Sequence, residues 1–495
     1  MAKIDAPYYP IIYVRGYAMT QSEIEATVST PYMGFNLGAT KVRQDWQGNV
    51  KKHIFESPLI RLMKDYGYVD TYSDGAVAKG SLSAKRVFIY RYYDQGDEDF
   101  GDGKAPSVKT AASGLNDFIL DVKTQVCGDD AAAQSAFKVY LVAHSMGGLV
   151  CRCFLQNPQI GQADTKALVD KVFTYATPHN GIDMAGMNTP SFLSMFDMNN
   201  FNRKRMADYL NVPAGDWVNT LNGTFDPRRF FCLVGTNHKD YNVAYTLSRR
   251  LAGEMSDGLV RIPSAVIQNA PRAFVYRSHS GPYGIVNSEE GYQNLVRFLF
   301  GTMKITGILE ADALPLPPPI KKLHKDGKDV RASYLFEATV APRGAFTFKL
   351  TERRKETYSA VHRKFDELFT SSNFESRESA RSPILFSTFL DERLIHNGKT
   401  LVFSVDLGIS TTGYEFDGFL GFDHHIPGEY LFRNTVTVRA TKSGDSWSIR
   451  YILSDESWAE SRGRKAKEDA DGFYIPLKTT KGFKGKLRLK AEPWS

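Results

Sequence analysis

The sequence predicts two folds in series, an α/β unit with a mostly parallel sheet followed by an all-β, sandwich-like unit. Before residue 309, apolar runs without alternation are separated by longer helix-like stretches, as in a parallel sheet that helices cover on both faces. After residue 323, apolar and polar residues alternate over about seven short segments. Between them A-L-P-L-P-P-P at 313–319 is stiff and extended, because prolines fix φ and remove amide donors. We therefore expect domains at 1–308 and 324–495, joined by a linker at 309–323.

The expected elements follow these two patterns. In the first domain we expect strands at Ile11–Val14, Arg86–Tyr90, Lys138–Ala143, Lys171–Tyr175, Phe230–Val234 and Ala273–Tyr276, and helices at Ser57–Tyr66, Ala112–Val126, Met146–Leu155 and Ser288–Leu299. In the second domain we expect strands at Tyr334–Val340, Phe346–Leu350, Leu401–Leu407, Tyr430–Thr437, Ser446–Leu453, Phe473–Leu477 and Lys486–Lys490. One helix, Glu356–Phe369, is expected among these strands.

Composition and charge exclude several classes of protein. The 495 residues are 42% hydrophobic and 24% charged, which is globular and excludes a disordered or collagen-like chain. Residues 1–319 hold 32 basic and 31 acidic residues, and residues 320–495 hold 30 and 24, so the formal charge of +7 is mostly C-terminal. This excess is too mild for a nucleic-acid partner but is compatible with an anionic membrane surface.

The cysteines and the N-terminus indicate the compartment. The four cysteines (Cys127, Cys151, Cys153 and Cys232) are too few for a disulfide scaffold, and we expect buried free thiols. Asp5 and Pro7 interrupt any secretory signal, and no apolar run reaches about 18 residues. We expect a chain that is cytoplasmic as synthesised, with export by a route without a signal peptide left open.

The most informative stretch is K-V-Y-L-V-A-H-S-M-G-G-L-V-C-R-C at 138–153. A strand ends at Ala143 and a helix begins just after Ser145, so the serine hydroxyl projects above the sheet from a strained turn. Such a turn requires small residues two positions before and after the serine, and Ala143 and Gly147 stand there. The helix N-terminus also favours developing negative charge. The pattern predicts that Ser145 is a nucleophile.

This stretch, with Arg152 after it, resembles the α/β-hydrolase superfamily, in particular its lipase and esterase branch. P-I-I-Y-V-R-G-Y at 10–17 is similar to the early strand of that branch, with Arg15 in place of the usual histidine. The resemblance implies an oxyanion hole made by the amides of Tyr17 and Met146. T-P-H-N-G at 177–181 resembles a further stretch of the branch, in which His179 is structural.

The remaining triad residues are also implied by the resemblance, which covers residues 8–301. S-D-G-L-V at 256–260 supplies the acid, Asp257, and the late loop R-S-H-S-G supplies the base, His279. The order serine, aspartate, histidine is the one this fold uses. Asp240 is the competing candidate for the acid, and we expect His144 to point away from the serine. The imidazole would take and return the serine proton, and the carboxylate would fix its tautomer.

The predicted function is a serine carboxylic-ester hydrolase of lipase or phospholipase type that acts on a lipid or a medium- to long-chain acyl ester. An acyltransferase or thioesterase with the same triad is the alternative, and a non-catalytic binding protein on the same fold is a further one. No cofactor or metal is expected, and Asp423-His424-His425 is expected to be an exposed loop rather than a metal site. No nucleic-acid partner is expected.

Two insertions, 18–54 and 184–226, flank the predicted site. The second supplies candidate substrate-binding residues, Met184, Met187, Phe192, Met195 and Phe196, because thioethers and phenylalanines suit an acyl pocket or a lid. A buried satellite core is the alternative.

In the second domain, Lys486-x-Arg488-x-Lys490 places three basic residues on one face of a strand. An edge strand guarded by lysines explains them, and peripheral contact with an anionic membrane is the alternative.

Overall fold

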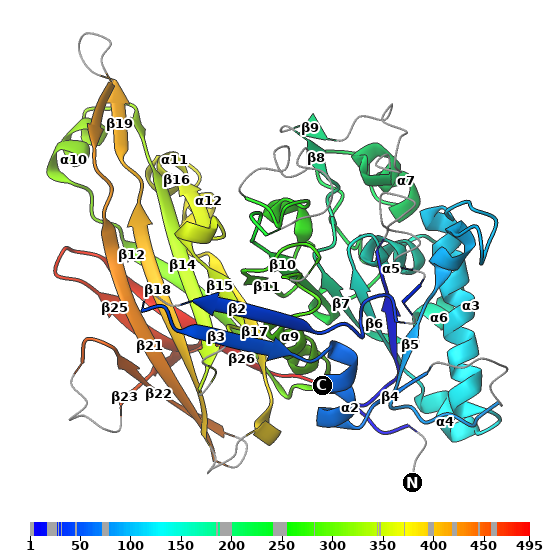
Figure 1. The fold of residues 1–495 in the computed structure, drawn as a ribbon. Coiled ribbons are helices and arrows are strands. Elements are labelled where there is room, and N and C mark those ends of the chain that lie inside the picture. Colours follow the sequence, from blue (N-terminus) through cyan, green and yellow to red (C-terminus); the bar gives the residue numbers. More distant parts are fainter. Residues whose placement is uncertain are drawn as a thin grey trace. The chain divides into compact units, whose positions relative to one another are not determined.

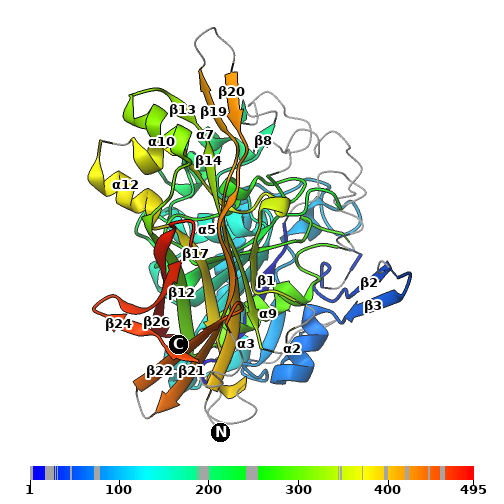
Figure 2. The ribbon, with the colours of Figure 1, turned by 90° about the vertical axis from the view of Figure 1, so that its left-hand side faces the viewer.

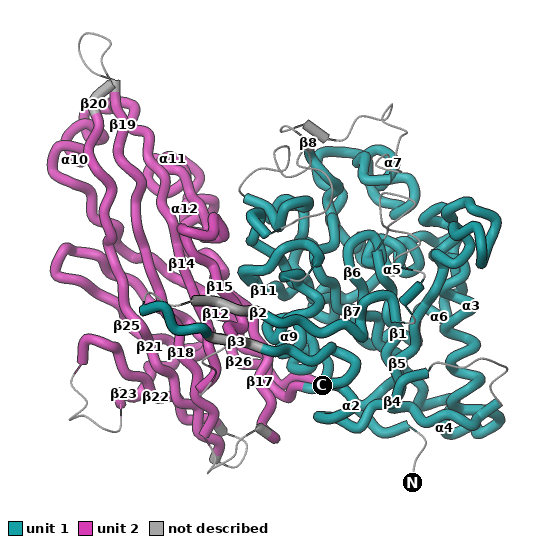
Figure 3. Tube along the Cα trace, viewed as in Figure 1, with its two compact units in different colours: residues 1–300 teal, residues 301–495 magenta. Residues whose placement is uncertain are grey.

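The chain divides into two compact units, residues 1–300 and 301–495, which are described separately (Figure 3). The computed structural model describes residues 4–16, 27, 29–30, 32–44, 47–71, 79–184, 187–188, 200–240, 255–281, 283–343, 345, 348–370, 372–394, 400–417, 423–443, 446–456 and 463–495. All four cysteines are buried free thiols, as the sequence predicts. None of the helices described in these ranges combines the length and apolar character that a membrane crossing requires.

Unit 1 is built on a seven-stranded sheet in the order β11-β10-β7-β6-β1-β5-β4, and every neighbouring pair is parallel (Figure 1). The strands are β1 (Ile11–Val14), β4 (Val69–Asp70), β5 (Arg86–Ile89), β6 (Val139–His144), β7 (Val169–Tyr175), β10 (Phe230–Gly235) and β11 (Arg272–Val275). The chain starts at β1, builds β4 and β5 on one side and then crosses to β6 on the other. This reversal makes the carboxyl ends of β1 and β6 the place where a ligand site is expected.

Helices cover the sheet of unit 1. They are α2 (Pro58–Tyr66), α3 (Val108–Cys127), α4 (Ala131–Ala136), α5 (Gly147–Gln156), α6 (Ala163–Lys166), α7 (Arg203–Leu210) and α9 (Glu289–Phe300), with single 3-10 turns η1 (Tyr92–Gly96), η3 (Pro227–Arg229) and η4 (Ile262–Ala265). Helix α3 packs on α5, whereas α9 lies against β7, β10 and β11 and packs Phe298 on Phe173 and Phe231. Ser57 and Ser107 cap α2 and α3 by accepting from backbone N–H groups. The predicted α/β architecture is confirmed.

Two short hairpins complete unit 1. β2 (Ala39–Gln44) pairs with β3 (Val50–Phe55) inside the first predicted insertion, and β8 (Asp183–Met184) pairs with β9 (Met187–Asn188) at the start of the second. Neither hairpin was predicted from the sequence, which indicated only insertions at these places.

Two of the sheets of unit 2 share one core. The five-stranded sheet has the order β17-β12-β26-β25-β24, and the seven-stranded sheet runs β15-β14-β18-β21-β22-β23 with β16 beside β14. Apolar residues of β12 and β26 belong to the same buried cluster as those of β14, β18 and β21. A core between two sheets is the arrangement of a β-sandwich, and β12, β26 and β21 can be followed in Figure 2.

The strands of the first sheet are β12 (Met303–Ala313), β17 (Ile384–Leu390), β24 (Lys467–Asp469), β25 (Gly472–Lys478) and β26 (Lys484–Pro493). Those of the second are β14 (Ser333–Pro342), β15 (Thr351–Arg353), β16 (Val361–Lys364), β18 (Thr400–Thr411), β21 (Tyr430–Ser443), β22 (Ser446–Leu453) and β23 (Arg464–Lys465). A third sheet joins β13 (Val330–Arg331), β19 (Tyr414–Asp417) and β20 (Asp423–Ile426). The helical segments are α10 (Pro318–Lys325), α11 (Phe365–Phe369), α12 (Phe374–Arg381), η5 (Lys355–Thr357) and η6 (Glu392–Leu394).

The boundary between the units differs from the expected linker. β12 pairs with β26 and β17, so residues 303–313 belong to unit 2 and the division falls after Phe300. The proline-rich segment therefore lies inside unit 2, where α10 begins at Pro318. A proline fits there because the first helical residue needs no amide donor.

Three expected elements in unit 2 need correction. The predicted helix at 356–369 is instead η5, β16 and the single turn α11, because residues 361–364 pair with β14. The predicted strand Phe346–Leu350 is not found in its described part, and β15 starts at Thr351. Asp423–Ile426 is strand β20, paired with β19, rather than a loop.

β26 is an inner strand, so the prediction of a lysine-guarded edge strand is wrong. It lies between β12 and β25. Arg488 is only 4% exposed and forms ion pairs with Glu310 and Asp469, and Lys486 lies 3.7 Å from Glu310. Two of the three basic side chains are therefore balanced by carboxylates.

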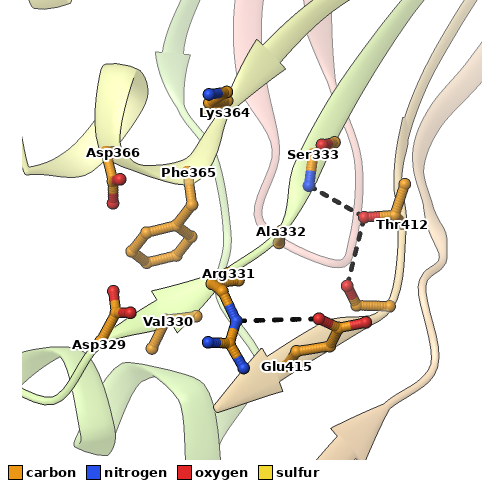
Figure 4. A pocket seen from close by; sticks show the side chains of 11 residues that line it. Asp329, Val330, Arg331, Ala332, Ser333, Lys364, Phe365, Asp366, Thr412 and Glu415 are labelled. Carbon is orange, nitrogen blue, oxygen red and sulfur yellow. Dashed lines mark hydrogen bonds and ion pairs between the residues drawn. The ribbon is translucent and has the colours of Figure 1, made fainter.

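A pocket of about 500 Å³ opens in unit 2 beside the third sheet (Figure 4). Its walls carry charges of both signs, including Arg331 and Glu415, whose side chains lie 3.8 Å apart. Ser333 and Thr412 close one side through a 2.9 Å hydrogen bond from the Ser333 amide to the threonine hydroxyl. No pattern in the sequence predicted this pocket.

Candidate active site

Ser145 occupies the sharp turn between β6 and α5. Its φ is +52°, a strained value for a residue with a side chain, and its amide donates to the Tyr175 carbonyl at 2.9 Å. A Cβ added to Gly147 would overlap the Val14 carbonyl oxygen, and one on Gly148 would overlap the Thr177 hydroxyl. These contacts give the physical reason for the small residues after the serine.

The side chains of Ser145, His279 and Asp257 form a continuous hydrogen-bonded chain. His279 Nε2 lies 3.0 Å from Ser145 Oγ, and His279 Nδ1 lies 2.9 Å from Asp257 Oδ2. The three residues follow the carboxyl ends of β6, β10 and β11, and all are buried, with exposed fractions of 6%, 1% and 3% for Ser145, Asp257 and His279. The structure thus brings together the three residues predicted from the sequence. Ser145 and Asp257 are 112 positions apart in the chain, and Asp257 and His279 are 22 apart.

The backbone around Asp257 fixes its carboxylate. Oδ1 accepts from the amides of Leu259 and Val260 at 3.0 and 2.8 Å, which leaves Oδ2 for the imidazole. Gly258, with φ of +102°, makes the turn that wraps these amides around the carboxylate. The His279 amide in turn donates to the Asp257 carbonyl at 3.0 Å. Asp257 and His279 are therefore joined by a side-chain bond and by a backbone bond.

The alternative acid, Asp240, is occupied elsewhere. Its carboxylate accepts from the Asn237 side-chain amide at 2.6 Å, and its own amide donates to the Asn237 side chain. The structure does not bring Asp240 to His279, whose Nδ1 faces Asp257.

Of the two residues expected to form the oxyanion hole, only Met146 is described; Tyr17 lies outside the described residues. Met146 is the N-cap of α5 and directly follows Ser145. Gly16 approaches so closely that a Cβ on it would lie 2.6 Å from the Met146 amide nitrogen. Arg15, which replaces the usual histidine, donates from Nη1 to the Met33 carbonyl at 3.0 Å, and its own carbonyl accepts from the Tyr92 hydroxyl at 3.0 Å.

Two further histidines are buried near the site. His179 Nε2 pairs with the Thr174 hydroxyl at 3.1 Å, and burial holds its pKa well below the usual range, in keeping with a structural role. His144 Nε2 lies 2.9 Å from the His279 carbonyl oxygen, and the two rings are 5.1 Å apart. From the sequence, His144 was expected only to point away from the serine, and a backbone partner 135 residues away leaves no local signal.

Arg152 secures the loops behind the site. It is fully buried, and its guanidinium donates to the carbonyls of His179, Val218 and Thr220 at 2.8, 2.7 and 2.8 Å. Burial lowers the pKa of Arg152 to about 10. The side chain thus ties α5 to the T-P-H-N-G stretch and to the end of the second insertion.

The expected substrate-binding residues are only partly described. Met184 and Met187 lie in β8 and β9, for which the structure gives the backbone, while Phe192, Met195 and Phe196 lie outside the described residues. In the described remainder of this insertion, Met206, Leu210, Val218 and Leu221 are buried, and α7 packs on α5. This part of the insertion therefore packs on unit 1 through these buried side chains.

Within the described ranges no three His, Cys, Asp or Glu side chains are grouped as a metal site would require. His425 of the Asp-His-His stretch instead packs close against Gly413, where an added Cβ would overlap its ring.

Part of the chain matches a known family, and several solved structures are similar to it. Residues 80–211, from the segment before β5 to the end of α7, match the PGAP1-like alpha/beta domain. Among solved structures, the phospholipase PlaB from Legionella pneumophila is 14% identical, with a TM-score of 0.36 over 81% of this chain and 86% of that chain. The Bacillus licheniformis lipase BlEst2 is 13% identical, with a TM-score of 0.29 over 57% and 89%. No curated protein matches the chain. Unit 1 has the α/β-hydrolase fold, and its residues 80–211 match the PGAP1-like hydrolase family.

Proposed function

We propose that the protein is a serine ester hydrolase of lipase or phospholipase type, with Ser145 as nucleophile, His279 as general base and Asp257 as the acid. The observation that carries this proposal is the hydrogen-bonded chain from Ser145 Oγ through both imidazole nitrogens to the Asp257 carboxylate. Acyltransfer and thioester hydrolysis use the same triad, and no feature of the described site favours them.

The geometry supports a two-step mechanism. Asp257 holds the Nδ1–H tautomer of His279, so Nε2 is free to accept the serine proton as Oγ attacks the acyl carbonyl. The amides of Met146 and Tyr17 would stabilise the oxyanion of the tetrahedral intermediate. His279 then gives the proton to the leaving alcohol, and water releases the acid from the acyl-enzyme in a second, equivalent cycle.

A fluorophosphonate probe tests the nucleophile directly. It should form one covalent bond to Ser145 and abolish hydrolysis of p-nitrophenyl esters, and Ser145→Ala should be neither labelled nor active. Ser135→Ala, in an exposed position of α4, is the matched control and should behave like the wild type. Labelling that persists in Ser145→Ala would remove the assignment.

A lipid substrate also suggests how unit 2 contributes. We propose weak contact with anionic membranes through Lys478, Lys484 and Lys490, which are exposed and, among the described residues, have no acidic partner. Lys478 and Lys484 stand directly opposite on β25 and β26, so their like charges favour a nearby anion. Lys484→Glu with Lys490→Glu should lower activity on anionic vesicles but not on soluble esters, and unchanged activity on vesicles would remove this role.

A further inference from the structure

All the polar groups of His279 are bonded within the site. Its side chain contacts Ser145 and Asp257, and its amide donates to the Asp257 carbonyl. Its remaining group, the backbone carbonyl, lies 2.9 Å from His144 Nε2. His144 is the last residue of β6, and Ser145 stands in the turn between β6 and α5, which we call the elbow. Ser145 therefore bonds to the ring of His279, and His144 bonds to its backbone carbonyl.

The protonation of His144 follows from its partner. A carbonyl oxygen can only accept, so His144 Nε2 must carry the hydrogen and donate it. Burial, together with the nearby His279 and Arg15, keeps the pKa of His144 well below its usual range. His144 is thus a neutral donor, and it adds no positive charge beside the imidazolium that forms on His279 during the reaction.

His279 is carried by a long loop. It lies in the connection between the end of β11 at Val275 and the start of α9 at Glu289. The loop has its own hydrogen bonds, from the Ile285 amide to the Ser278 carbonyl and from Gly284 to Gly281. Bonds from the Asn237 amide to the Arg277 carbonyl and from the His279 amide to the Asp257 carbonyl join the loop to the connection after β10. The bond from His144 joins it to the end of β6, directly beside Ser145.

We propose that His144 is a positioning residue that holds the backbone of His279, and so places Nε2 against Ser145 Oγ. This inference rests on the proposed function. Without this bond, the peptide group of His279 could rotate and move the imidazole away from Ser145. A displacement of a catalytic group by about 1 Å can lower the rate about 100-fold. His144 Nε2 bonds to the backbone of His279, whereas Ser145 Oγ bonds to the imidazole, so His144 acts through His279.

Three substitutions separate positioning from packing. His144→Phe keeps the volume but loses the donor. His144→Gln keeps a donor at the reach of Nε2, whereas His144→Asn carries its amide on a shorter side chain and is the matched control. We expect His144→Phe and His144→Asn to lower kcat on p-nitrophenyl esters about 10- to 100-fold with KM little changed. His144→Gln should recover most of the activity.

Two further measurements exclude a general loss of structure. The rate of fluorophosphonate labelling of Ser145 should fall in the same proportion as kcat, and the downfield proton resonance of the His279–Asp257 hydrogen bond should shift in the Phe and Asn variants but not in Gln. Thermal unfolding shows whether each variant is folded. If His144→Phe does not fold, the comparison of His144→Gln with His144→Asn still tests the positioning role.

Activity of His144→Phe close to the wild type, or equal impairment of Gln and Asn, would overturn the positioning role. A wild-type protein that is neither labelled nor active would instead overturn the proposed function itself.

Discussion

Gly16 lies directly against Ser145. A Cβ on Gly16 would overlap the Cβ of Ser145 and would lie 2.5 Å from the His144 carbonyl oxygen. The segment that follows β1 can therefore approach the turn between β6 and α5 this closely only where it has no side chain.

Gly16→Ala should therefore abolish ester hydrolysis and destabilise unit 1 by about 1–3 kcal/mol, because the methyl group must push β1 away from the elbow. Ester hydrolysis and denaturant unfolding would measure the two effects. Gly215→Ala is the control, since a Cβ there meets no atom within 4 Å. Full activity in Gly16→Ala would show that the two segments separate without cost.

Asp257→Asn should lower kcat by about 10⁴-fold, because an amide in place of the carboxylate no longer selects the required tautomer of His279. Asp240→Asn should leave kcat within about twofold, because Asp240 bonds to Asn237. Steady-state kinetics on a soluble ester compare the two variants. The opposite ranking would transfer the role of acid to Asp240.

Arg152→Met should destabilise the protein by about 2–6 kcal/mol, because the buried carbonyls of His179 and Val218 lose their donor and each unsatisfied group costs about 1–3 kcal/mol. Arg152→Lys should recover only part of this loss, since an ammonium cannot reproduce the planar fork. Urea unfolding is the measurement, with the exposed Arg205→Met in α7 as control. A loss below 1 kcal/mol in Arg152→Met would show that water replaces the guanidinium.

The buried Lys171 should make the free energy of unfolding depend on pH. Burial lowers its pKa to about 7, below the ordinary 10.5 of an unfolded chain, and Nζ donates to the Leu299 carbonyl at 2.8 Å. Between these two values the unfolded chain binds more protons, so the free energy of unfolding should rise with pH, by at most about 1.4 kcal/mol per unit. Lys171→Met should remove this contribution, measured as the difference between wild type and variant from pH 6 to 10. Parallel curves would show that Lys171 stays charged when folded.

A hydrophobic acyl site predicts a dependence on chain length. If the second insertion holds the acyl chain, kcat/KM should rise from acetyl to octanoyl esters, by up to about fourfold per buried methylene. A series of p-nitrophenyl esters measures this slope. A maximum at acetyl would indicate a small-substrate esterase and a purely structural insertion.

The sequence was sufficient where the signal is local. The strands of unit 1 are continuous apolar runs because both sheet faces are covered, and the residues around Ser145 carry the steric demands of one turn. His279 and Asp257 lie in other loops, and their assignment came from a resemblance to known motifs rather than from any local physical signal.

The sequence was insufficient where a partner is distant. Arg488 reads as one of three surface cations, and only the pairing of β26 with β12 brings Glu310, 178 residues away, to its guanidinium. Likewise V-H-R-K at 361–364 has no alternating apolar pattern, and it becomes β16 because β14 supplies its partner. Neither neighbour is visible in the local pattern of residues.

The central place of β26 has a consequence for synthesis of the chain on the ribosome. Unit 1 can be completed once residue 300 has emerged, but β12, which follows at once, waits for an inner neighbour encoded about 180 residues later. Throughout that interval β12 exposes an unpaired backbone edge, which is an opportunity for mispairing and for chaperone capture. A stop codon anywhere between these two strands would leave a finished hydrolase unit attached to a β-unit that cannot close.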